Sequence, residues 1–111
     1  MRKLKEVFSA KTGTGASTEV LRKRLCPMGS QPIKAKLTLS YGATPTITVH
    51  IEGLELDDSW TSLVNATYTT GATKFLKAPH QTRHRKYRLN VTANTNVTIT
   101  KGYIGVGMVE D

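Results

Sequence analysis

The sequence predicts an all-β fold, a small β-sandwich or jelly roll preceded by an extended basic N-terminal arm. Three observations support this fold class. Apolar and polar residues alternate in several runs, threonine is abundant beside valine, isoleucine and tyrosine, and turn-forming residues recur about every ten positions. Alternation places apolar side chains on one face of a strand, and β-branched residues favour extended backbone. A chain of 111 residues is long enough for one hydrophobic core.

The clearest alternation runs from Pro32 to Gly53 and contains two expected strands. Each has apolar residues at every second position: Ile33, Ala35, Leu37 and Leu39 in the first, and Ile47, Val49 and Ile51 in the second. The Tyr41–Pro45 segment between them has the glycine and proline of a short turn, so the strands are expected to pair as an antiparallel hairpin. The apolar face of this hairpin needs a cover, expected from strands near residues 60–64 or 86–108.

Further strands are expected after this hairpin. Trp60–Val64 has the composition of a short strand, and Arg83–Thr92 alternates with Tyr87 on its apolar face. From Val97 to Met108 the alternation slips by one residue at Lys101–Gly102. A slip beside a glycine predicts a β-bulge or a tight turn at that point.

Residues 1–18 are expected to form a flexible basic arm and connector, and residues 19–111 a single β-sandwich domain. Leu4, Val7 and Phe8 fit neither the helical nor the strand period cleanly, so residues 1–11 could begin as a strand or remain a mobile arm. The segment Thr12–Thr18 is composed of small residues typical of a connector. Terminal segments of this kind are ordered only where another group binds them.

The positive charge of the chain is large and unevenly distributed. The formal net charge is +8, and seven basic residues lie within the first 24 positions. A second basic cluster lies in Arg83–Arg88, whereas acidic residues gather in Glu52–Asp58. Such polarity predicts a partner of complementary charge without deciding between nucleic acid and protein.

No pattern of residues in the sequence indicates a reaction. The three histidines, His50, His80 and His84, lack the spacing of a zinc site and have no serine, cysteine or carboxylate beside them in a nucleophile motif. Cys26 is a single cysteine, and the Asp57–Asp58 pair is typical of a solvated loop. The sequence therefore predicts a protein that is not an enzyme and has no catalytic residue, metal site or cofactor. No segment has membrane-spanning length, so no membrane partner is expected.

The basic cluster at Arg83–Arg88 allows two kinds of partner. Arg83, Arg85, Lys86 and Arg88 provide the charge for phosphate contacts, which makes a small basic nucleic-acid-binding β-domain the alternative function. The alternation, however, places Tyr87 on the core face, away from these basic groups, and single-strand readers display their stacking rings beside the charges. An acidic protein surface is therefore the favoured partner.

Several motifs of the chain resemble small β-sandwich virion proteins of tailed bacteriophages. They are Gly-Ala-Ser-Thr at Gly15–Thr18, Ile-Lys-Ala-Lys-Leu-Thr-Leu at Ile33–Leu39, Trp-Thr-Ser-Leu at Trp60–Leu63, Lys-Tyr-Arg-Leu-Asn-Val-Thr at Lys86–Thr92 and the final Val-Thr-Ile-Thr at Val97–Thr100. In length and basic character the chain is similar to the capsid decoration proteins, also called cement or staple proteins, including the staple of short-tailed enterobacterial phages.

This resemblance implies a structural protein of the virion. It would be synthesised in the host cytoplasm, bind the outer surface of the capsid lattice and staple neighbouring subunits of the major capsid protein, with a homodimer as the expected assembly. The family has no catalytic or ligand residues to carry over. The partner-binding residues expected here are Arg2, Lys3, Lys5, Arg22, Lys23, Arg24, Trp60, Arg83 and Arg85. Trp60 is expected as an anchor in either the core or an interface.

Overall fold

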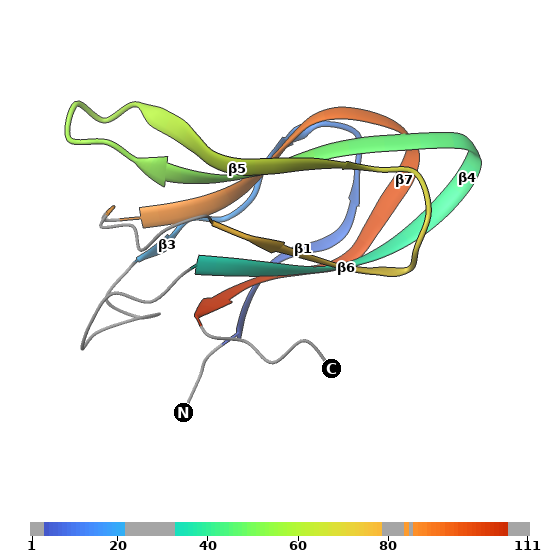
Figure 1. Ribbon diagram of the computed structural model, residues 1–111, viewed down its shortest axis with the longest axis horizontal. Helices are drawn as coiled ribbons and strands as arrows, with labels where there is room; N and C mark the ends of the chain where they lie inside the picture. Colours follow the sequence, from blue (N-terminus) through green and yellow to red (C-terminus); the bar gives the residue numbers. More distant parts are fainter. Residues whose placement is uncertain (1–3, 22–32, 79–83, 85, 107–111) are drawn as a thin grey trace.

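The computed structural model describes residues 4–21, 33–78, 84 and 86–106. Of these residues, 81% lie in strands and none lies in a helix, which confirms the predicted all-β class. The strands form one antiparallel sheet (Figure 1). They are β1 (Leu4–Thr12), β2 (Gly15–Ala16), β3 (Val20–Leu21), β4 (Ile33–Leu54), β5 (Trp60–Tyr68), β6 (Thr73–Lys77) and β7 (Lys86–Val106).

Two long strands, β4 with 22 residues and β7 with 21, form the centre of the sheet and pair with each other over most of their length. The strands β1, β2 and β3 pair in turn along the other edge of β7, and β5 and β6 pair along the other edge of β4. The predicted hairpin between the two halves of Pro32–Gly53 is therefore wrong. Residues 33–41 and 46–54 belong to the single strand β4, and each half pairs with β7 instead of with the other half.

The sheet is folded because its chain segments bend at the same end, on the right in Figure 1. β4 bends near Thr44, with φ of 47°, and β7 bends near Asn96, with φ of 56°. The β1–β2 segment has positive φ at Ala10 and Gly13, and the β5–β6 connection at Gly71. Left-handed backbone is unfavourable for threonine and alanine, so these bends need support from neighbouring groups. We call this region the bent end.

Side chains from β4 and β7 supply that support by donating hydrogen bonds to backbone carbonyls. The Asn96 side-chain amide donates to the carbonyl of Ala43 at 2.6 Å, and that of Asn94 donates to Gly13 at 2.9 Å. The Tyr41 hydroxyl donates to the carbonyl of Gly71 at 2.7 Å. Burial raises the pKa of Tyr41, which keeps this donor protonated. Each of these bonds links one bend to the next.

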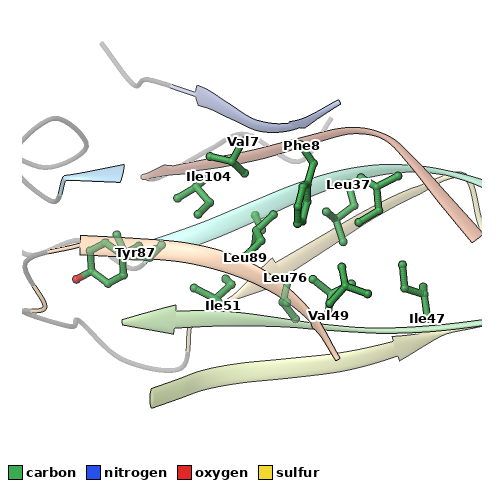
Figure 2. Packing of buried hydrophobic residues seen from close by; sticks show 14 of the residues in the cluster. Val7, Phe8, Leu37, Ile47, Val49, Ile51, Leu76, Tyr87, Leu89 and Ile104 are labelled. Carbon is green, nitrogen blue, oxygen red and sulfur yellow. The ribbon is translucent and has the colours of Figure 1, made fainter. Parts of the chain in front are cut away.

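The hydrophobic core lies between the two halves of the folded sheet (Figure 2). Because side chains alternate along β4, Leu37 in its first half and Ile51 in its second half both point into the core, and each has 0% exposed surface. Tyr87 is also fully buried, as its place in the alternation predicted. The predicted irregularity near Lys101 is confirmed, because the pairing of β4 with β7 shifts by one residue between Ile99 and Lys101.

The N-terminal segment expected to be a flexible arm contributes to this core in its described part. β1 pairs with β7, and Val7 and Phe8 are each only 7% exposed. They are adjacent in sequence and both buried because the pairing is irregular between Glu6 and Phe8. A bulge of this kind breaks the period of two, which explains why the pattern did not distinguish a strand from a mobile arm.

Candidate binding surfaces

Trp60, one of the residues predicted to bind a partner, begins β5 at the end of the sheet opposite the bent end, on the left in Figure 1. We call this region the open end: Val20–Leu21, Gly53–Trp60, His84 and Lys86–Arg88. The pairing brings Leu21 beside Lys86, Tyr87 beside Gly53, and Leu54 beside Trp60. Arg22–Arg24 follow Leu21 in sequence and Arg85 precedes Lys86. These residues lie outside the described part of the chain, as do Arg2, Lys3 and Arg83.

Trp60 lies half-buried on the outer face of the open end and covers an ion pair. The guanidinium carbon of Arg88 is 4.2 Å from the centre of the Trp60 ring. The Arg88 Nε donates to Glu52 Oε1 at 2.7 Å, and the Asn90 side-chain amide donates to Glu52 Oε2 at 3.0 Å. Glu52 is the buried charged residue of the described chain, with 8% exposed surface. Trp60 is therefore outside the core cluster, and part of its ring remains available to a partner.

The described part of the basic Arg83–Arg88 cluster is largely neutralised. Arg88 pairs with Glu52, and Lys86 Nζ lies 3.2 Å from Glu19 Oε1. Sequence reasoning missed both pairs because the acidic partners are 36 and 67 residues away in sequence. Lys5, another predicted partner-binding residue, is exposed on β1, opposite Ile104 and in the other half of the folded sheet from Trp60.

The β4–β5 turn at the open end presents an apolar side chain on an ordered loop. Leu56 is 93% exposed, the largest exposure of any large hydrophobic residue in the described chain. The backbone N–H groups of Glu55 and Asp58 donate to the carbonyls of Ser59 and Glu55, at 2.7 and 3.0 Å. The hydroxyl of Ser59 donates to Asp57 at 2.6 Å, and this bond holds the pKa of the Asp57 carboxyl below its usual value. These bonds fix the backbone of the turn that carries Leu56.

The histidines show contacts that the sequence did not predict. His50 Nδ1 lies 2.8 Å from the Ser62 hydroxyl, and His50 Nε2 lies 3.1 Å from the Thr92 hydroxyl. Both ring nitrogens are thus bonded to hydroxyl groups, and no described carboxylate bonds to this imidazole. His84 Nε2 lies 3.3 Å from Glu55 Oε2. Among residues 4–21, 33–78, 84 and 86–106, no group of three His, Cys, Asp or Glu residues is arranged to hold a metal ion.

A second surface lies on the outer face of the sheet half formed by β6, the first half of β4 and the second half of β7. We call it the lysine face: Lys34, Lys36, Phe75, Lys77, Lys101 and Tyr103. The pairing places Lys34 directly opposite Lys77, and it places Lys36 between Phe75 and Tyr103. These side chains point outward because their sequence neighbours, among them Ala35, Leu37 and Ile104, are fully buried. In the sequence, Lys34 and Lys36 alternate with the apolar residues Ile33, Ala35 and Leu37, which indicates that they lie on the polar face of a strand. No local pattern places Phe75 and Tyr103 beside them.

A shallow cleft of about 510 Å³ lies at the bent end and is lined by polar groups and one tyrosine. Two of its lining residues are Asn94 and Asn96, whose side-chain N–H groups already donate to the backbone. The polar groups of this cleft therefore serve to hold the bends.

Comparisons with family models, with curated proteins and with solved structures find no match to the chain. Within the described ranges there is also no helix long and apolar enough to cross a membrane.

Proposed function

We propose that this protein is a structural virion protein that binds the outer surface of a phage capsid and staples neighbouring subunits of the major capsid protein. The observation that carries this proposal is that Trp60, whose ring lies over Arg88, and the exposed Leu56 are both at the open end. Tryptophan and arginine are among the residues that contribute most to protein interfaces, and docking would remove the exposed apolar side chain of Leu56 from water.

The folded sheet suits such an attachment. We propose that it is a small sandwich of the jelly-roll kind, because β4 and β7 each run through both halves and the apolar side chains lie between them. A rigid body loses little conformational entropy on docking, and the ordered turn presents Leu56 ready to bind. Many copies on one lattice then add stability even when each single contact is weak.

Attachment is tested with capsids that lack the protein. Leu56→Asp and Trp60→Ala are each expected to weaken the affinity for such capsids, measured by co-sedimentation, by about thirtyfold, because an interface anchor contributes about 2 kcal/mol. Leu56 is solvent-exposed, so Leu56→Asp leaves the core intact. The control is Thr12→Asp at the bent end, also an exposed position, which is expected to bind like the wild type. Equal binding of all four proteins would reject the open end as the attachment surface.

The proposed homodimer has a suitable surface in the free edge of β5. Among the described strands, β1 and β6 carry charged residues at their outer edges, whereas Trp60–Tyr68 contains none. Charged edge residues prevent pairing between molecules, and β5 lacks this protection. Only β4 pairs with β5 in the described chain.

We predict a dimer in sedimentation equilibrium, with twice the mass of the 12.2 kDa chain. Asn65→Lys combined with Thr67→Lys, both at exposed positions of β5, is expected to shift the protein to a monomer through like-charge repulsion. Ser9→Lys at the edge of β1 is the matched control and should leave the dimer unchanged. A wild-type monomer, or a dimer that survives the β5 substitutions, contradicts this arrangement.

A further inference from the structure

We propose that the lysine face is a binding site for single-stranded nucleic acid. This site lies on the other half of the sheet from Trp60 and Arg88, and the proposal does not depend on attachment to a capsid. It also differs from the basic Arg83–Arg88 cluster, whose described lysine and Arg88 are already paired with carboxylates.

The first argument is the concentration of positive charge on this face. Lys34 and Lys77 are direct cross-strand partners, and Lys36 is two residues from Lys34 on the same face. Strand pairing thus gathers basic residues on one face of the sheet, where the phosphates of a polyanion could contact them. Lys36 and Lys77 form no ion pair or hydrogen bond with any described residue.

Acidic groups do little to offset this charge. Glu6 is the described carboxylate on this face, and it lies 3.4 Å from Lys101 Nζ at the β1 side. This ion pair offsets the charge of Lys101, whereas Lys36 and Lys77 have no described carboxylate as a partner. The face is thus positive along β4 and β6.

The second argument is the row Phe75, Lys36, Tyr103 that crosses three neighbouring strands. Phe75 and Tyr103 are both partly exposed, and their positions on the neighbouring strands lie on either side of Lys36. Neighbouring strands lie about 4.8 Å apart, so the two rings are about 10 Å apart along this row. Rings that flank a cation provide stacking surfaces for bases while the lysines contact the phosphates.

This combination favours a single strand over other polyanions. In a duplex the bases are stacked on one another, so a flat sheet face can contact only the phosphates of the backbone. The two rings would then have no base to stack on. An acidic protein segment would use the lysines but gains nothing specific from two rings at this spacing. A single strand uses both groups at once.

The test is fluorescence anisotropy with a labelled oligothymidylate of about 20 nucleotides, a length that spans a site of this kind. At low salt we expect binding whose affinity falls with increasing salt. Neutralisation of about two phosphates, by Lys36 and Lys77, predicts a slope of about −1.4 in a plot of log affinity against log salt concentration. Lys36→Gln combined with Lys77→Gln is expected to weaken binding by about tenfold and to flatten that slope to less than half.

The rings are tested separately from the charges. Tyr103→Leu, with Phe75→Leu as a second variant, is expected to weaken binding by about fivefold or more while the salt slope stays unchanged, because stacking releases no counterions. Lys86→Gln at the open end is the control for the loss of one charge and should bind like the wild type. The thermal unfolding curve of each variant shows whether it is folded.

Three results would overturn the inference. The first is an absence of binding at low salt. The second is a loss of affinity in Lys86→Gln as large as that in the variant with both Lys36→Gln and Lys77→Gln. The third is that the leucine variants bind the oligonucleotide, a duplex of equal length and polyglutamate as tightly as the wild type does. The last result would identify the lysine face as a surface for any polyanion, including acidic protein, and reject base stacking.

Discussion

Leu37→Ala is expected to lower the free energy of unfolding by about 3 kcal/mol, within the range of about 2–5 kcal/mol for buried leucines. Leu37 is 0% exposed and lies in the first half of β4, where its side chain faces the other half of the folded sheet (Figure 2). The two halves are connected through the continuous strands β4 and β7, so they have little freedom to close a cavity between them. The lost methyl groups therefore leave a void, which adds to the lost hydrophobic transfer energy.

The measurement is equilibrium unfolding in urea, with Leu56→Ala as the matched control. Leu56 is 93% exposed, so the same substitution there removes no core contact and is expected to change the free energy by less than about 0.5 kcal/mol. A loss below about 1 kcal/mol in Leu37→Ala would mean that the space between the halves is not closely packed. It would contradict the folded arrangement of the sheet.

Local alternation was sufficient to predict which residues of β4 and β7 are buried, because side chains alternate wherever a strand is regular. It was insufficient to predict pairing. Tyr41–Pro45 has the residues of a hairpin turn, yet the chain there bends without reversing against itself, because Asn96 of β7 bonds to Ala43 and Tyr41 bonds to the β5–β6 connection. These contacts join residues 53 and 30 positions apart, a separation that no local pattern reports.

The candidate surfaces show the same limit. The basic residues of Arg83–Arg88 were recognisable in the sequence, but their neutralisation by Glu19 and Glu52 follows from strand pairing. The lysine face became visible only once β6 and β7 were placed on either side of Lys36. Val7 and Phe8 were missed for a local reason, since one irregular pair removes the period on which a strand prediction depends.

Glu52→Ala is expected to lower the free energy of unfolding by about 3 kcal/mol, nearly as much as a large core substitution. The Glu52 side chain is 11% exposed and its partner Arg88 21% exposed, so little water reaches either charge. Removing the carboxylate leaves the Arg88 guanidinium beneath Trp60 and the Asn90 amide without their acceptor. A buried charge that loses its partner costs more than the net contribution of the intact pair.

A double-mutant cycle distinguishes this cause from a general packing defect. Arg88→Met keeps an unbranched apolar side chain under Trp60, and in that background Glu52→Ala is expected to cost about 1 kcal/mol, because no unpaired guanidinium remains. Glu52→Gln keeps an acceptor for the Asn90 amide, so its loss of unfolding free energy is expected to lie between the losses of about 1 and about 3 kcal/mol. If Glu52→Ala costs the same in both backgrounds, the buried carboxylate stabilises the open end through packing alone, and the ion pair beneath Trp60 contributes nothing to holding β4 and β7 together there.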